Sequence, residues 1–478
     1  MLFNSLSFAI FLPIIFSLYW LLNKRGLKFQ NRLLLIASYF FYSCWDWRFL
    51  FLLIFSTLLD YFTAIKMSEA KNQSAKKFWF LLSVFINLGF LGVFKYYNFF
   101  AASFTEAVSH FGFHVNPMTL NIILPVGISF YTFHGLSYVI DVYKNTIKVE
   151  RNFIDYAVFV SFFPLLVAGP IERATHLLPQ IKQKRVFDYA KATDGLRQIL
   201  WGLFKKVIVA DQCAEFVNTL FSNSANYSGP TLLLGAVLFI FEVYGDFSGY
   251  SDIALGTARL FGIELLKNFS YPFFSRDIAE FWRRWNISLT SWFRDYVYIP
   301  LGGSKGGTWM KVRNIFIIFL LSGFWHGANW TYIVWGALYA IYFLPLLLLN
   351  KNRQNLDTVA AGKYLPSLKE FLNMLLTFGL VVMATIVFRS ESVGDALKYI
   401  AGIFSSNASS LSIDFPVQSI VAAVLLIIVE WVQREQDHAL CFDGKKVPTV
   451  VRWSSYLILA TLVASFLGEK NTFIYFQF

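Results

Sequence analysis

Charged residues are scarce in this sequence. Only 15% of its 478 residues are Asp, Glu, Lys or Arg, against about 25% in an ordinary soluble domain, and 56% are hydrophobic. One globule of this length cannot hide so much apolar surface, so lipid must face much of it. The composition therefore excludes an ordinary soluble enzyme and predicts a multi-pass membrane protein.

Several motifs are missing as well. The three cysteines, Cys44, Cys213 and Cys441, form no C-x-x-C pair, which argues against a disulfide framework or a metal cage. There is no H-E-x-x-H motif, so we expect no bound metal, and no G-x-x-x-x-G-K-[ST] motif, which argues against a nucleotide-driven pump. The sequence has no internal repeat of fixed period, and such a repeat would have indicated a secondary transporter. The apolar start of the chain lacks a basic leader, so we expect it to be a retained span.

The basic residues, which give a net charge of +12, lie in short loops between apolar runs. That distribution encodes orientation in a membrane, so we expect no nucleic-acid partner. Segments 99–118 and 213–229 contain no Lys or Arg and are expected outside, whereas the basic loops are expected in the cytoplasm. Because 173–206 is basic again, we expect 153–170 to enter the membrane and return. The apolar runs are 2–22, 33–45, 47–65, 78–98, 120–142, 153–170, 196–212, 230–246, 314–349 (one or two segments), 371–388, 416–432 and 451–467.

Residues 245–313 are too polar for a plain span and too aromatic for an ordinary loop. Five apolar residues recur there at helical spacing with three arginines around them, which predicts a helix lying in the headgroup region. The apolar stripe comprises Phe281, Trp285, Leu289, Trp292 and Tyr296, and the arginines are Arg283, Arg284 and Arg294. A basic interfacial anchor is the plain alternative to a binding site.

A histidine lies within a later apolar stretch, where His326 follows Trp325 and precedes a glycine. An ionisable side chain at membrane depth is costly and by default suggests a function. Imidazole is also the side chain best suited to act as a general base near neutral pH. The alternative is a buried neutral histidine whose nitrogens are satisfied by neighbours.

Two long motifs carry a resemblance to a known family. W-R-R-W-N-I-S-L-T-S-W-F-R-D-Y-V-Y-I-P-L-G-G (282–303) and S-G-F-W-H-G-A-N-W-T-Y-I-V-W-G (322–336) resemble the signature of membrane-bound O-acyltransferases, in the bacterial branch that includes alginate O-acetyltransferase. Segments 129–143, 163–181 and 244–256 resemble the same branch. The resemblance implies an all-α fold with about 11 transmembrane helices, plus short re-entrant and interfacial helices around a central tunnel. It implies one membrane domain, with a catalytic core at 120–350 and C-terminal helices at 371–478.

By resemblance, His326 matches the family's catalytic histidine and Asn286 matches a second, upstream catalytic position. The polysaccharide-modifying branch often has histidine at that second position, and asparagine can hold or polarise an oxygen but cannot take a proton. Asp246, Ser248 and Asp252 are supporting candidates. The two carboxylates could orient the histidine, and pairing with the nearby arginines as structural ion pairs is the favoured alternative.

Other residues have weaker assignments. Trp325 is a supporting candidate beside the histidine, and Arg283, Arg284 and Arg294 are expected to bind the phosphates of the donor. Tyr475, in the ending F-I-Y-F-Q-F, resembles a tyrosine motif that relays acyl groups outside the cell, and an aromatic-belt role is the alternative. A structural loop contact is expected for Glu172, Arg173 and His176, and packing for His134.

These residues predict an acyl transfer that needs no metal and no permanently bound cofactor. An acyl thioester, acetyl-CoA in the leading interpretation, would arrive from the cytoplasm, and His326 would deprotonate the acceptor hydroxyl while Asn286 stabilises the oxyanion. The expected product is an O-acetylated polysaccharide of the alginate type, completed by an extracytoplasmic acetyltransferase partner, and the expected location is the bacterial cytoplasmic membrane. The alternatives are peptidoglycan O-acetylation, D-alanylation of teichoic acid, a polysaccharide or lipid transporter, and an export scaffold.

Overall fold

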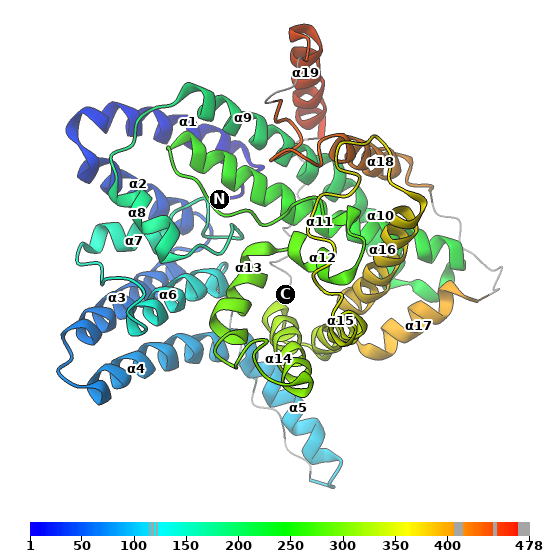
Figure 1. Cartoon of the computed structure of the whole chain (residues 1–478), viewed down its shortest axis with the longest axis horizontal. Coiled ribbons are helices and arrows are strands. Elements are labelled where there is room, and N and C mark those ends of the chain that lie inside the picture. Colours follow the sequence, from blue (N-terminus) through cyan, green and yellow to red (C-terminus); the bar gives the residue numbers. More distant parts are fainter. Residues whose placement is uncertain (114–115, 117–118, 121–122, 406–413, 443–446, 467–478) are drawn as a thin grey trace. The chain divides into compact units, whose positions relative to one another are not determined.

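The computed structural model describes every residue except 114–115, 117–118, 121–122, 406–413, 443–446 and 467–478 (Figure 1). Each regular element in the described residues is a helix, which confirms the predicted all-α class. The chain divides into two compact units. Unit 1 comprises Met1–Ala192 and Ala258–Leu266, and unit 2 comprises Thr193–Thr257 and Lys267–Phe478.

Seven described helices are long and apolar enough to cross a bilayer, which confirms a multi-pass membrane protein. They are Leu6–Arg25, Trp47–Glu69, Gln73–Ser109, Gly229–Leu260, Trp330–Leu348, Leu368–Arg389 and Thr449–Phe466. By this measure the described helices do not confirm the expected count of about 11 spans. The 314–349 run is two helices, since residues 327–329 separate them.

Unit 1 contains eight α-helices. They are α1 (Leu6–Leu21), α2 (Leu27–Ser43), α3 (Trp47–Glu69), α4 (Gln73–Leu91), α5 (Tyr97–Ser109), α6 (Ile128–Tyr143), α7 (Phe153–Ser161) and α8 (Ala174–Lys182). A buried carboxylate joins α3, α4 and α6, because Asp60 accepts hydrogen bonds from Ser83 (2.6 Å) and Asn87 (2.7 Å). A Cβ on Gly135 would lie 2.0 Å from Asp60, so glycine is needed for α6 to approach so closely.

The segment expected to enter the membrane and return contains α7, which has only nine residues. A helix of that length is about 14 Å long, and crossing the apolar core takes about 30 Å. The short helix therefore agrees with the expectation. His134 of α6 is completely buried, with its ring 6.0 Å from that of Phe159, in accord with a packing role.

Unit 2 holds most of α9 and α11 and the remaining α-helices. These are α9 (Tyr189–Leu203), α10 (Asp211–Ser222), α11 (Gly229–Leu260), α12 (Ile278–Arg284), α13 (Ile287–Phe293), α14 (Thr308–His326), α15 (Trp330–Leu348), α16 (Leu368–Arg389), α17 (Val393–Ile403), α18 (Val417–Val432) and α19 (Thr449–Phe466). A further helical turn, Phe204–Ala210, joins α9 to α10. Of the most apolar 18 residues of α11, 83% are buried, so this stretch forms part of the interior of the unit.

Glycines set the distance between α9 and α11. A Cβ on Gly256 would lie 2.3 Å from the carbonyl oxygen of Gly195, and one on Gly249 would lie 2.7 Å from that of Gly202. The two glycines of each helix are seven residues apart, which is about two helical turns. They therefore lie on the same face of their helix. Small residues of this kind let helix backbones touch, as in membrane helix pairs.

The prediction of one interfacial helix over 281–296 is wrong. The helix breaks between α12 and α13, because Asn286 adopts a left-handed conformation (φ 43°, ψ 53°), which asparagine tolerates better than most residues. The apolar stripe is also not available to lipid headgroups, since Phe281, Trp285 and Leu289 are all buried. Trp292 is buried too, so the stripe belongs to the interior of unit 2.

The glycine contacts make a prediction about stability. We expect Gly256→Ala to lower the free energy of unfolding by about 1–3 kcal/mol, because the new methyl group must push α9 and α11 apart. The control is Gly379→Ala in α16, where a Cβ meets nothing within 4 Å, and a gain of about 0.5–1 kcal/mol is expected. Thermal unfolding of both purified variants in one detergent measures the difference. Equal unfolding temperatures would contradict close packing at these glycines.

Candidate active site

His326 is the last residue of α14, and a short loop follows it before α15 begins. The loop ends where the side chain of Asn329 accepts a hydrogen bond from the backbone N–H of Thr331 (3.0 Å), a normal N-cap. The imidazole is buried, at 4% exposure, and aromatic rings surround it. Its ring centroid lies 4.9 Å from that of Trp325, 5.0 Å from Trp335 and 5.3 Å from Phe388.

Asn286 is buried in the break between α12 and α13. Its side-chain amide nitrogen has no hydrogen-bond partner among the described residues. A left-handed residue and a buried amide without a partner are both unfavourable, and such features cluster at functional sites. The amide of Asn286 therefore has a hydrogen-bond donor that the described side chains do not use, and its catalytic role stays a prediction.

A second asparagine holds that break in place. Asn268 accepts hydrogen bonds from the backbone N–H of Ile287 (2.9 Å) and from Ser288 Oγ (2.5 Å). Its own amide nitrogen donates to Ser251 Oγ of α11 (2.9 Å). We call these three side chains, Ser251, Asn268 and Ser288, the asparagine latch. The latch ties the D-F-S-G-Y-S-D segment of α11 to the residues that follow Asn286.

Tryptophan rings connect His326 to α12, the helix that precedes Asn286. Trp335 lies 5.0 Å from His326 and 5.7 Å from Trp282, measured between ring centroids. Trp282 lies on α12, four residues before Asn286 in the sequence. The structure thus brings the segments that carry His326 and Asn286 to the same aromatic cluster in unit 2.

The carboxylates of the α11 motif form ion pairs, but not with the expected arginines. Lys205 Nζ lies 2.6 Å from Asp252, and Lys206 Nζ lies 2.7 Å from Asp246 and 2.8 Å from Asp211. The prediction that these carboxylates form structural ion pairs is therefore confirmed. The predicted partners were arginines, and this part of the prediction is wrong, because both partners are lysines. Both lysines lie on the helical turn after α9, where the sequence showed no motif.

The three arginines bind other groups. Arg283 donates to the backbone carbonyls of Asn352 (2.9 Å) and Asn355 (2.7 Å), and burial lowers the pKa of its guanidinium. Arg284 pairs with Glu280 at 3.0 Å, and Arg294 with its neighbour Asp295 at 2.7 Å. Arg283 and Arg294 also line a cleft beside the aromatic cluster.

A cleft with a volume of about 460 Å³ lies beside the aromatic cluster. Trp282, Phe319 and Ser322 form part of its mostly apolar wall, and Ser322 lies one helical turn before His326. Arg283, Arg294 and Arg353 add cationic groups to the lining. Arg284 is not among the lining residues, so the structure brings together only two of the three arginines that the sequence grouped. The cleft combines an apolar wall with a set of guanidinium groups.

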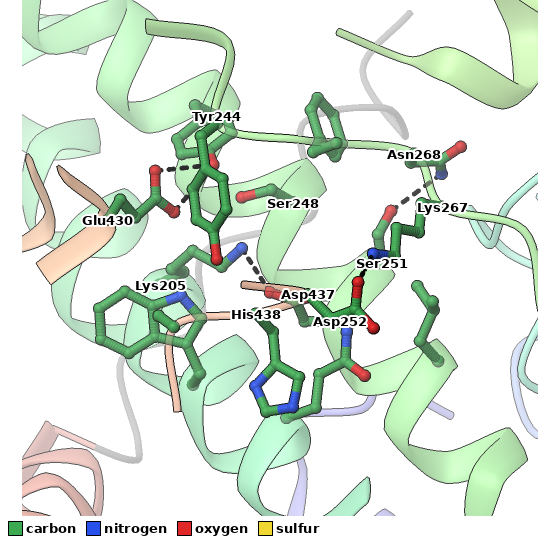
Figure 2. Close-up of a pocket in the computed structure, with 16 residues that line it drawn as sticks. Lys205, Tyr244, Ser248, Ser251, Asp252, Lys267, Asn268, Glu430, Asp437 and His438 are labelled. Atoms are coloured by element: carbon green, nitrogen blue, oxygen red, sulfur yellow. Dashed lines mark hydrogen bonds and ion pairs between the residues drawn. The ribbon is translucent and has the colours of Figure 1, made fainter. Parts of the chain in front are cut away.

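Ser251 and Asn268 of the latch line a smaller polar pocket of about 30 Å³ (Figure 2). It is lined by Ser248, by the Lys205–Asp252 ion pair and by Tyr244, whose hydroxyl lies 2.8 Å from a carboxylate oxygen of Glu430. This volume accommodates one or two waters and no substrate. The ion pair with Lys205 thus makes Asp252 part of a structural network, whereas Ser248 Oγ is buried in the pocket lining without a hydrogen-bond partner among the described residues.

The remaining candidates lie in unit 1 or outside the described residues. Glu172 is completely buried, where it accepts a hydrogen bond from the backbone N–H of Leu266 (2.6 Å) and lies 2.8 Å from His176 Nδ1. That hydrogen bond raises the pKa of His176. Both contacts agree with the structural role expected for this loop. Tyr475, the expected acyl relay, lies outside the described residues.

Comparison with known proteins decides the family. The model of the membrane-bound O-acyltransferase family matches residues 146–388, which contain both candidate catalytic residues. The chain belongs to this family. It is 40% identical to the probable alginate O-acetylase AlgI of Pseudomonas aeruginosa, over 86% of this chain and 76% of that protein.

Two other relatives match along the whole of this chain. The probable alginate O-acetylase AlgI of Pseudomonas putida is 36% identical over the full length of both proteins. The peptidoglycan O-acetyltransferase of Helicobacter pylori is 32% identical over this entire chain and 98% of its own length. The predicted family and the predicted O-acyltransferase class are thereby confirmed.

Lys206 offers a test of the ion-pair framework. We expect Lys206→Met to lower the free energy of unfolding by about 3–5 kcal/mol, because Asp246 and Asp211 would stay buried without their cation. Lys398→Met is the matched control, since Lys398 pairs with Asp395 on the surface and such pairs contribute little. Chemical unfolding of the two variants compares them, and similar losses for both would contradict this framework.

Proposed function

We propose that this membrane-bound O-acyltransferase moves acetyl groups from acetyl-CoA to hydroxyls of a cell-surface polysaccharide. The observation that carries the proposal is a buried histidine one helical turn beyond an arginine-lined apolar cleft. Relatives named as alginate O-acetylases support the polysaccharide acceptor. We place the enzyme in the bacterial cytoplasmic membrane, with the donor on the cytoplasmic side.

The proposed reaction needs one proton acceptor and one hydrogen-bond donor. The imidazole of His326 removes the proton of the acceptor hydroxyl as its oxygen attacks the thioester carbonyl. The side-chain N–H of Asn286 donates to the oxyanion that develops. The new C–O bond forms, the C–S bond breaks, and the departing CoA thiolate receives the proton from the imidazolium. The aromatic cluster around His326 excludes water that would otherwise hydrolyse the thioester.

The cleft is the proposed donor site. CoA carries phosphates, which guanidinium groups bind well, and its acyl end is apolar. Arg294 and Arg353 are exposed and can meet the phosphates, while Arg283 holds the loop at Asn352 and Asn355. The acyl end would then pass between Trp282 and Ser322 to reach the imidazole.

The acceptor side of the proposal includes a partner. An extracytoplasmic acetyltransferase would complete the transfer to the polymer, and Tyr475 is the proposed acyl relay toward it. We treat the whole chain as one functional domain, because the family match spans residues of both units.

Peptidoglycan is the second candidate acceptor, which the relative from Helicobacter pylori supports. Mass spectrometry of surface glycans with and without the intact chain separates the two.

The catalytic assignment makes a direct prediction. We expect His326→Ala to lower the rate of CoA release about 10²–10⁴-fold, as for loss of a general base, and Asn286→Ala about 10²–10³-fold, as for loss of an oxyanion donor. Release of CoA thiol from acetyl-CoA by purified protein, with an alginate oligosaccharide as acceptor, measures both. His110→Ala is the control, since that histidine is exposed at the end of α5.

A transporter or an export scaffold would behave differently. Neither needs a base, so His326→Ala would keep its function as long as the protein folds. Unchanged thioester cleavage in His326→Ala, at an unchanged unfolding temperature, would therefore refute the enzymatic proposal.

The donor site predicts a change in KM. The double variant Arg294→Gln and Arg353→Gln should raise the KM for acetyl-CoA by about tenfold with little change in kcat, because the lost contacts bind a remote part of the donor. The KM of the unaltered protein should rise with ionic strength, since salt screens exposed charges. Lys398→Gln is the control for a surface cation outside this cleft. If the KM for acetyl-CoA changed neither in the double variant nor with ionic strength, the donor would bind outside this cleft.

A further inference from the structure

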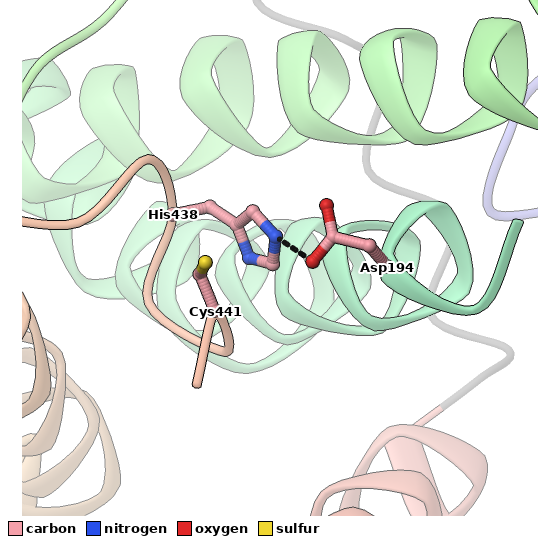
Figure 3. Close-up of side chains that lie close together, drawn as sticks. All are labelled: Asp194, His438 and Cys441. Atoms are coloured by element: carbon pink, nitrogen blue, oxygen red, sulfur yellow. Dashed lines mark hydrogen bonds and ion pairs between the residues drawn. The ribbon is translucent and has the colours of Figure 1, made fainter. Parts of the chain in front are cut away.

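Three side chains of different chemistry that the proposed acyl transfer does not use meet in unit 2. Asp194 lies on α9, and His438 and Cys441 lie in the segment that follows α18 (Figure 3). One oxygen, one nitrogen and one sulfur from these residues all lie within 4.8 Å of one another. The segment between α18 and α19 thus meets a helix that lies 244 residues earlier in the chain.

The imidazole occupies the middle of this cluster. His438 Nε2 lies 2.9 Å from Asp194 Oδ1, and Figure 3 shows the opposite edge of the ring turned toward the thiol of Cys441. The side chain of His438 is only 1% exposed. Its Nδ1 has no hydrogen-bond partner among the described residues. A buried ring nitrogen without a partner is unfavourable and points to a group that the side chains alone do not supply.

We propose that Asp194, His438 and Cys441 bind a divalent transition-metal ion of the zinc type. Carboxylate oxygen, imidazole nitrogen and thiolate sulfur are the three donors that zinc takes in proteins, with bonds of about 2.0–2.3 Å. Tetrahedral ligands at those bond lengths lie about 3.3–3.8 Å apart. The three atoms lie within 4.8 Å of one another. To bind one ion, the His438 ring must turn until one of its nitrogens faces both Asp194 and Cys441, and bonds to the ion then replace the hydrogen bond between Nε2 and Asp194. Hard cations such as Mg²⁺ or Ca²⁺ do not fit, because they require oxygen ligands.

The same three residues could also act without a metal, as a thiol activated by a histidine and an acid. Cys441 is buried, however, and is not among the residues that line the polar pocket next to it. A nucleophile needs a path for its substrate, whereas a structural metal needs only its ligands. The burial therefore favours metal binding.

The site has a structural consequence. A metal would fasten residues 438–441 to α9, the helix that also carries the glycine contacts with α11. His438 lines the polar pocket that holds the Lys205–Asp252 ion pair (Figure 2). Metal binding would thus fix one wall of that pocket. The proposal does not depend on the acyl-transfer reaction.

The test uses the full-length protein in detergent, stripped with a chelator and titrated with Zn²⁺ or Co²⁺. We expect one metal ion per chain by elemental analysis, and with Co²⁺ a near-ultraviolet thiolate-to-metal absorption band. Both should disappear in Cys441→Ser and His438→Gln, and Asp194→Asn should weaken affinity at least tenfold. Cys213→Ser, another buried cysteine, should change neither readout.

Alkylation gives an independent readout that does not require the variants to fold. Zn²⁺ should protect Cys441 of the unaltered protein from iodoacetamide, with the modified peptide identified by mass spectrometry. Metal that binds without a thiolate band, or equal alkylation of Cys441 with and without Zn²⁺, would overturn the site. Loss of metal with normal CoA release would leave the acyltransferase proposal standing, so the two proposals can fail separately.

Discussion

Two adjacent lysines, Lys205 and Lys206, neutralise the half-buried Asp252 and the buried Asp246 of α11, and the position of that helix depends on them. A charge removed from water is costly unless it is paired at close range. Only 15% of the residues in this chain are charged. The pairs therefore allow only a narrow range of positions for α11 relative to the turn after α9. The glycine contacts between the two helices impose the same restriction from the backbone side.

The candidate active site takes its geometry from this helix. Ser251 of α11 binds Asn268, and Asn268 binds the first residues of α13, so the left-handed Asn286 is held from one side. Such a conformation is unfavourable by itself and persists where its surroundings enforce it. On the other side, Trp282 and Trp335 pack between the asparagine segment and His326. Polar contacts thus position Asn286, and aromatic packing positions His326.

The proposed metal cluster extends the same framework. The glycines of α9 contact α11, and Asp194 of the same helix contacts His438 in the segment after α18. A single helix therefore joins α11 to that segment. His438 belongs both to that cluster and to the wall of the polar pocket. A ligand at the cluster would therefore stabilise the surroundings of the Lys205–Asp252 pair and not the reacting centre.

Local patterns in the sequence determined the helical class, the membrane location, the family and the two candidate catalytic residues. Composition decides whether a chain needs lipid, and an intramembrane histidine within a long motif is visible without coordinates. The break at Asn286 was not visible, because the apolar spacing of 281–296 continues through it. The partners of Asp246 and Asp252 were also missed, since Lys205 and Lys206 lie on a helical turn with no motif.

Only the tertiary structure brought Asp194 to His438 and Cys441, or placed Arg353 beside Arg283 and Arg294. Spacing along the chain records which side chains share a face of one helix. Which faces then meet depends on packing between helices far apart in sequence, where glycines and buried ion pairs set the distances. The sequence by itself therefore determined the chemistry available to this protein, and the packing of its helices decided which groups act together.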